Sequence, residues 1–248
     1  MNALRRWLRL GLLLGSLFVC LPLHLLWKLA RRHSPWPRLF LALAARSVGA
    51  RVRIVGTPLR RDVFFIANHV SWIDILALGG VTGCAFVSKD DVGRWPLVGW
   101  LAAQNNTILI ERTNRRAVGN QIDAMRAAIA DHQPVALFPE GTTGNGRELL
   151  PFKPTLLAVL LPPPRAIRIQ PVMIDYGSAN DDIAWHGEEG AGANAGRILS
   201  RPGNIVVTLH FLDPFDPGEH PDRKTLAAQV RNRIEVAQHA FRSRVGPV

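Results

Sequence analysis

A histidine and an aspartate five residues apart give the strongest chemical signal in the sequence. They belong to the run NHVSWID at residues 68–74, which follows the apolar run VFFIA at residues 63–67. On one straight helix, His69 and Asp74 would point about 140° apart and could not meet. A helix that begins inside the run removes this problem, because Asp74 then lies in its first turn and His69 precedes it. We therefore predict an imidazole–carboxylate pair, with Ser71 as the N-cap of the helix.

Such a pair is suited to general-base catalysis. The aspartate fixes the tautomer and stabilises the imidazolium, and the second ring nitrogen takes a proton from a hydroxyl group. The alternative is that Asp74 only caps a helix and His69 is a turn residue. No GxSxG serine motif is present, and Cys84 lies in an apolar run that disfavours a thiolate. The eight histidines are scattered without HExxH-type spacing, so we expect no metal.

The sequence FPEGT at residues 138–142 ends another strand-like run. It brings the carboxyl group of Glu140 to a loop in which Gly141 allows close approach of a ligand and Thr142 can donate a hydrogen bond. An ordinary turn would also explain this sequence. We treat all three residues as candidate binding residues.

Two basic residues also follow strand-like runs. Arg112 comes after residues 107–111 and offers a planar, bidentate donor for phosphate or carboxylate. Lys89 follows residues 84–88 and is a second candidate binding residue. A solvated strand end for Arg112 and a surface position for Lys89 are the simpler explanations.

The elements that must position these residues alternate between β-rich and helical patterns, which predicts an α/β domain. Apolar stripes predict one helix around Met125 and a closing helix around Val230, and Pro171 predicts a sheet edge or strand end. Residues 177–203 are predicted to form a long excursion near the active face. The expected strands are residues 51–55, 63–67, 84–88, 107–111, 135–138, 167–174 and 205–211.

The net charge of +11 is concentrated at one end of the chain. Residues 1–61 contain twelve basic and no acidic residues, whereas the remaining 187 residues carry 18 basic and 19 acidic ones. A nucleic-acid partner is therefore not expected, because the domain after this segment is nearly neutral. Basic charge within an apolar segment indicates an anionic membrane surface.

The apolar N-terminal segment predicts a helical membrane anchor. Residues 10–27 carry no formal charge and would form a helix of about 27 Å, slightly shorter than a hydrocarbon core of about 30 Å. Pro22 and His24 interrupt this run, and a second apolar run covers residues 39–48. We favour a hairpin in the cytoplasmic leaflet of the plasma or inner membrane over a single span; a buried core helix is the third possibility. The expected division is residues 1–50 for the anchor and 51–248 for the α/β domain.

Four ordered segments resemble signatures of the glycerolipid acyltransferase family, specifically its 1-acylglycerol-3-phosphate acyltransferase branch. The run 68–74 is similar to NHxxxxD, residues 106–112 to GxxFIxR, FPEGT to the third block and residues 169–174 to the fourth. KDDVGRWPLVG at residues 89–99 also resembles the linker of the family. The resemblance covers roughly residues 60–175.

This resemblance implies a mixed sheet flanked by helices and a fatty acyl transfer to 1-acylglycerol-3-phosphate, which yields phosphatidic acid. The acyl donor would be an acyl carrier protein or coenzyme A thioester, and no resident cofactor is implied. The implied catalytic residues are His69 and Asp74. The implied substrate-binding residues are Arg112, Glu140, Gly141, Thr142 and Lys89.

Departures from the family pattern leave the acceptor open. Thr143 stands where many members have arginine, so one phosphate-binding cation is missing unless Arg115, Arg116 or Arg147 replaces it. A zwitterionic acceptor such as a lyso-ornithine lipid is therefore the alternative. A non-catalytic lipid-binding protein and a hydrolase that uses His69 with water are the rival functions.

Overall fold

The computed structural model describes residues 2–31, 34–110, 122–123, 125–127, 129 and 133–245. In this part of the chain, seven strands form one sheet in the order β1-β7-β6-β2-β5-β3-β4. Neighbouring strands are parallel except β6 and β7, which are antiparallel, so the predicted mixed sheet is confirmed. The strands are β1 (Ala50–Val55), β2 (Val63–Ala67), β3 (Ala85–Lys89), β4 (Ile108–Ile110), β5 (Val135–Leu137), β6 (Arg168–Asp175) and β7 (Ile205–Phe211).

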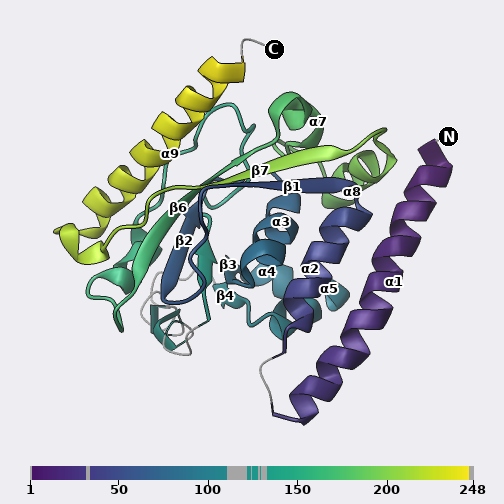
Figure 1. The fold of residues 1–248 in the computed structure, drawn as a ribbon, viewed down its shortest axis with the longest axis horizontal. Coiled ribbons are helices and arrows are strands. Elements are labelled where there is room, and N and C mark those ends of the chain that lie inside the picture. The colour runs from purple at the N-terminus through teal and green to yellow at the C-terminus, as the bar shows by residue number, and fades with distance from the viewer. Residues whose placement is uncertain are drawn as a thin grey trace.

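Helices cover both faces of the sheet (Figure 1). The longest are α1 (Asn2–Leu29), α2 (Trp36–Ser47), α3 (Ile73–Thr82), α5 (Pro96–Gln104), α8 (Ala191–Ser200) and α9 (Arg223–Val245). Shorter helical segments are α4 (Asp90–Gly93), η2 (Thr155–Leu160), η3 (Gly177–Ala179), α7 (Asn180–Ile183) and η4 (Pro217–Glu219).

Strand β2 lies at the centre of the core because all five of its residues are buried. Such a continuous apolar run is typical of a parallel strand with both faces covered. Phe65 belongs to the buried cluster that includes Leu78 of α3, whereas Phe64 and Ile66 belong to the cluster that includes Val230 of α9. This strand therefore holds the chain that follows Ala67 in a fixed position.

The two predicted apolar stripes lie in the core. Met125 and Ile129 are fully buried in helical backbone, and Leu226, Val230 and Ile234 of α9 are fully buried as well. The residue Val118, which belongs to the first stripe, lies outside the described part of the chain.

The edge position predicted from Pro171 is wrong. This residue lies in β6, which is an interior strand between β7 and β2. The carbonyl of Pro171 accepts a hydrogen bond from Leu212, just beyond the end of β7 at Phe211. The regular ladder between β6 and β7 covers Val172–Asp175 on β6, so the missing N–H of Pro171 removes no hydrogen bond from it.

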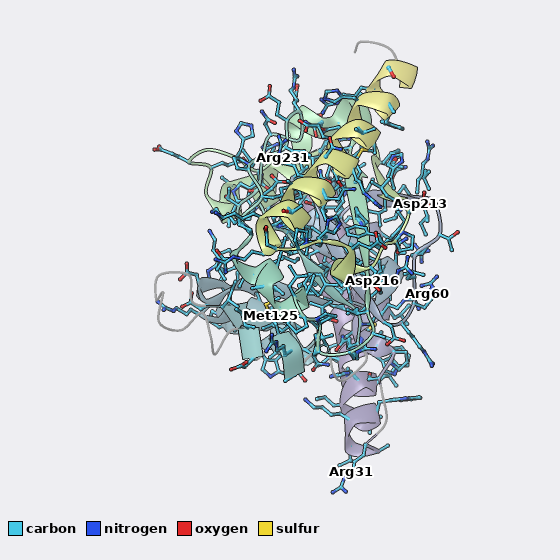
Figure 2. All side chains as sticks on the ribbon, turned by 90° about the vertical axis from the view of Figure 1, so that its left-hand side faces the viewer. Arg31, Arg60, Met125, Asp213, Asp216 and Arg231 are labelled. Carbon is cyan, nitrogen blue, oxygen red and sulfur yellow. The ribbon has the colours of Figure 1, made fainter. Side chains whose placement is uncertain are left out.

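Helix α1 continues through Pro22, so the predicted interruption does not occur. By length and composition it is apolar enough to anchor the protein in a membrane, and only 11% of its most apolar window is buried. Figure 2 shows Arg31, just after α1, at the opposite end of the molecule from the C-terminal end of α9. Helix α2 packs closely on α3 because Gly80 has no side chain: an added Cβ would lie 2.8 Å from Ala42 Cα.

Candidate functional site

The structure brings His69 and Asp74 into direct contact. They lie between the end of β2 at Ala67 and the first turn of α3, and His69 Nδ1 is 2.8 Å from Asp74 Oδ2. The Asp74 side chain is fully buried, whereas 17% of the His69 side chain is exposed. Because Nδ1 is hydrogen-bonded to the carboxylate of Asp74, Nε2 is the ring nitrogen that can exchange a proton with a substrate.

The predicted N-cap role of Ser71 is wrong. Helix α3 begins at Ile73, the residue before it is Trp72, and no side chain caps this end. Instead, Asp74 Oδ2 accepts hydrogen bonds from the backbone N–H groups of Val70 at 2.7 Å and Ser71 at 2.9 Å. The aspartate thus holds the turn as well as the imidazole, and the Ser71 hydroxyl makes only a long contact of 3.5 Å with the N–H of Ile73.

The FPEGT loop holds His69 through its backbone. Glu140 Oε1 accepts a hydrogen bond from His69 N–H at 3.0 Å, and Gly144 N–H donates to the His69 carbonyl at 2.8 Å. The ring of Phe138 stacks on the imidazole with 4.1 Å between centroids. Three contacts from one loop therefore fix the position of the histidine.

Glu140 is only 3% exposed. Burial raises the pKa of its carboxyl group to about 7, and the charge of Asp74 adds to this increase, while hydrogen bonds from the His69 and Leu150 backbone oppose it. The Glu140 carboxyl group accepts hydrogen bonds from the backbone of His69 and Leu150, which indicates a positioning role for this candidate binding residue.

The other candidate binding residues are less closely grouped. Gly141 forms the turn after β5 with a φ of 77°, and Thr142 is exposed beside it. The exposed Lys89 ends β3, which β5 separates from β2. Arg112 lies outside the described residues, as do Arg115 and Arg116.

Two residues with a role at this site were missed in the sequence. The amide side chain of Asn68 donates to the Ile174 carbonyl at 2.9 Å and accepts from the Ile174 N–H at 2.7 Å, which ties the end of β2 to β6. Two residues later, the Tyr176 hydroxyl donates a hydrogen bond to Asp74 Oδ1. Burial raises the pKa of Tyr176 well above its usual value, and the adjacent Asp74 charge acts in the same direction, so the hydroxyl stays protonated. The available signal was that Tyr176 is the only tyrosine in the chain.

The excursion at residues 177–203 packs against the same turn, as predicted. The backbone N–H of Trp185 donates to the Val70 carbonyl at 2.9 Å, and the ring nitrogen Nε1 of Trp72 donates to Asn194 Oδ1 at 3.0 Å. Thr143, where the resemblance suggests arginine, donates its hydroxyl hydrogen to the Trp185 carbonyl. The threonine therefore helps to attach the excursion to the FPEGT loop.

An apolar cavity of about 480 Å³ lies next to these residues. It is bounded by α1, α2, α3 and α5, and Trp72 from the turn after His69 is part of its wall. Phe86 also lines the cavity and stacks on Phe138, which in turn stacks on His69. The stacked rings of Phe86 and Phe138 therefore connect one wall of the cavity to the imidazole of His69.

Similarity to known proteins agrees with this geometry. Residues 51–175 match the Acyltransferase family model. A lyso-ornithine lipid O-acyltransferase of Rhizobium meliloti (strain 1021) is 34% identical over 92% of this chain and 85% of its own length. A 1-acyl-sn-glycerol-3-phosphate acyltransferase of Neisseria gonorrhoeae is 36% identical over 78% of this chain and 76% of its own length.

The fold is also found in a solved structure. The crystal structure of the 1-acyl-sn-glycerophosphate acyltransferase of Thermotoga maritima has a TM-score of 0.68, with 20% identity, over 97% of this chain and 98% of that chain. This likeness extends over the N-terminal helices as well as the sheet. From the family match and the full-length relatives, the chain belongs to the acyltransferase family.

Proposed function

We propose that this protein transfers a fatty acyl group to the hydroxyl of a lysolipid, with His69 as the general base. The observation that supports this most strongly is the His69–Asp74 pair, in which a buried carboxylate orients a partly exposed imidazole. The family match supports the class of reaction.

In the proposed reaction, His69 Nε2 takes the proton of the acceptor hydroxyl while the hydroxyl oxygen attacks the thioester carbon. A new C–O bond forms, the C–S bond breaks, and the proton passes from the imidazolium to the leaving thiolate. Asp74 stabilises the imidazolium in between. The thioester is that of acyl carrier protein or coenzyme A, and the acyl chain occupies the apolar cavity beside Phe86.

We propose a lyso-ornithine lipid as the acceptor, in preference to 1-acylglycerol-3-phosphate. The lyso-ornithine lipid acyltransferases among the relatives match more of this chain, up to 92%. Thr143 supplies no charge for a phosphate, and Arg147, a candidate replacement cation, is paired with Asp181 at 3.0 Å. Among the described residues, both features reduce the positive charge that is available for a phosphate.

We propose that the enzyme acts at the cytoplasmic face of the membrane, where the acceptor lipid and either thioester are available. Helix α1 contains the apolar residues for this contact, and the twelve basic residues before position 62 favour an anionic surface.

The test is acyl transfer by purified protein in lipid vesicles. Labelled acyl carrier protein and acyl-coenzyme A thioesters are each supplied with lyso-ornithine lipid or 1-acylglycerol-3-phosphate at equal mole fraction. We expect faster transfer to the lyso-ornithine lipid, loss of transfer in His69→Ala, and wild-type transfer in the control His239→Ala, which changes an exposed histidine of α9.

Each contrary result has a defined meaning. Transfer to 1-acylglycerol-3-phosphate alone would replace the acceptor proposal. Release of free fatty acid without an acceptor would indicate a hydrolase. Full activity of His69→Ala would reject the general-base mechanism.

A further inference from the structure

Helix α5 exposes an apolar surface of its own. Its sequence, PLVGWLAAQ, contains no charged residue. Leu97 is 53% exposed and Trp100 is 42% exposed, and the preceding Trp95 is exposed as well. Several large exposed apolar side chains on one short helix mark a contact surface.

This surface is continuous with the membrane-anchoring helix α1. The two helices line the same apolar cavity, α1 with Leu17 and α5 with Leu101, for example. Gln104 lies at the end of α5. Its side-chain oxygen Oε1 accepts one hydrogen bond from Lys28 Nζ at 3.2 Å and one from the ring nitrogen Nε2 of His24 at 3.3 Å. Figure 1 shows α5 on the same side of the sheet as α1 and α2, whereas α9 covers the opposite side.

Helix α1 has apolar residues on both of its faces. Residues such as Leu17 line the cavity, whereas others, including Leu8, Phe18 and Leu29, are exposed on the outside. The helix is attached to the domain near both ends, by Arg9 on α8 and by Lys28 on α5. An anchor that is fastened along the domain brings the neighbouring α5 to the same lipid surface.

The flanking charges fit an anionic lipid surface. Lys28 and Arg31 are exposed at the end of α1, and Arg94, just before α5, has a side chain that is 75% exposed. Asp90 and Asp91 of α4 lie close to Arg94 in sequence, and Asp90 pairs with it, so the net basic charge of this surface comes from Lys28 and Arg31. Basic residues beside exposed tryptophan are typical of helices that lie in a membrane interface.

We propose that α5 is a second membrane-contacting element, which inserts Leu97 and Trp100 into the same lipid monolayer as α1. The partner is an anionic phospholipid surface. With α1 and α5 both in the monolayer, two walls of the apolar cavity border lipid, and a lipid chain reaches the cavity without crossing water. The contact itself does not depend on the proposed acyl transfer.

Site-specific fluorescence tests this contact. Cysteine is introduced at Leu97, at Phe18 on α1 as the positive control, and at Val236 on α9 as the negative control; Val236 is 60% exposed. The native Cys20 and Cys84 are buried and should take up little label. An environment-sensitive dye on each cysteine is measured with vesicles of phosphatidylglycerol and phosphatidylethanolamine, some of which contain nitroxide-labelled lipids.

We expect the dye at position 97 to shift to shorter wavelength on vesicle binding and to be quenched by the nitroxide lipids, as at position 18. The dye at position 236 should stay in water and be quenched by iodide. A water-exposed dye at position 97 on vesicles that embed position 18 would overturn the proposal. A shift of the dye emission at position 97 that occurs without vesicles and grows with protein concentration would also overturn the proposal. It would show that a second copy of the protein, and not lipid, covers this surface of α5.

A charge substitution gives an independent measurement. Leu97→Asp should lower the vesicle partition coefficient roughly tenfold, because a charged side chain cannot replace a buried leucine in the interface. Val236→Asp is the matched control and should leave partitioning unchanged. Equal partitioning of the two variants would overturn the proposal, whatever their acyl transfer rates.

Discussion

Asp74 connects the separate parts of the site. Its two carboxylate oxygens accept four hydrogen bonds, from the His69 ring, two backbone N–H groups and Tyr176. A fully buried carboxylate is tolerated only when it is satisfied in this way. The same contacts fix the carboxylate that orients the imidazole, so the fold and the proposed chemistry depend on one side chain.

Tyr176 gives a prediction about this arrangement. Tyr176→Phe removes the hydrogen bond that the tyrosine hydroxyl donates to Asp74 Oδ1. Without this donor, the carboxylate of Asp74 interacts more strongly with a protonated imidazole. We expect protonated imidazole to persist to higher pH, so the acidic limb of the kcat/KM profile should move to higher pH and kcat should fall. Burial of an unsatisfied oxygen should also cost about 1–3 kcal/mol of stability.

The control for this variant is Ser47→Ala, which removes a buried hydroxyl that donates to the Leu43 carbonyl on α2. It should leave the pH profile unchanged. If folded Tyr176→Phe has the wild-type pH profile, Tyr176 is a packing residue and does not position the general base.

Glu140 gives a prediction about stability and pH. Its carboxyl group has a pKa of about 7 in the folded protein and a usual value of 4.5, so the folded state binds more protons between these values. The wild type should therefore lose stability as pH rises from about 4.5 to 7. Glu140→Gln does not titrate, and the stability difference in its favour should grow by at most about 1.4 kcal/mol per pH unit.

Urea denaturation in detergent at several pH values between 4.5 and 8 measures this difference. Glu140→Gln can also differ from the wild type by an amount that is the same at every pH, because a new amide hydrogen bond changes stability equally across this range. The prediction therefore concerns only the part of the difference that changes with pH. A difference that does not vary with pH would show that Glu140 titrates normally in the folded protein.

The sequence reveals the His69–Asp74 pair but not the residues that hold it. His69 and Asp74 are only five residues apart, and a helix begins between them. Both facts can be recognised in the local sequence, so the contact was predictable. Tyr176 lies 102 residues from Asp74 and reaches it only because β6 runs beside β2. Glu140 was expected at the substrate because Gly141 next to it allows a ligand to approach the loop closely. In the folded protein, the carboxylate of Glu140 instead accepts a hydrogen bond from the backbone of His69.

At the scale of the elements, α1 depends on a buried arginine. The Arg9 guanidinium donates to carbonyls at and beyond the end of α8, those of Ile198 at 3.0 Å, Arg201 at 3.1 Å and Gly203 at 2.8 Å. A cation at the C-terminal end of a helix also interacts favourably with the helix dipole. Gly49 leaves the space for this side chain, because an added Cβ would lie 2.4 Å from it.

Arg9→Ala should therefore loosen the attachment of α1. We expect faster amide hydrogen exchange in residues 2–20 and a loss of about 2 kcal/mol in the free energy of unfolding, since hydrogen bonds from a charged donor are lost. Arg46→Ala, which changes an exposed arginine of α2, is the control. Equal exchange in both variants would show that apolar packing alone holds α1.

The apolar pattern predicted both N-terminal helices but not the contacts of α1. A proline lowers helix propensity, yet Pro22 is tolerated within α1, so the predicted interruption was wrong. The charge of Arg9 suggested a lipid contact, whereas its partners are backbone carbonyls from residues almost 200 positions away. Local sequence carries no information about such partners.

For the whole molecule, the position of the cavity suggests how acyl chain length is selected. The cavity is formed between the N-terminal helices and the α/β domain, and neither part encloses it alone. Its volume of about 480 Å³ is fixed by small residues in its wall as well as by large ones. One of these is Ala102 of α5, which lines the cavity, whereas its neighbour Ala103 is exposed.

Ala102→Phe should fill part of this cavity and shift the preference to shorter acyl chains, which competition between labelled thioesters of different lengths measures. The shift should appear in kcat/KM for long chains, because a side chain that displaces part of the acyl chain removes apolar burial from the transition state as well as from the ground state. Ala103→Phe adds the same ring on the same helix and should keep the wild-type preference. An unchanged preference in Ala102→Phe would mean that the acyl chain binds elsewhere, even if His69 and Asp74 catalyse the transfer.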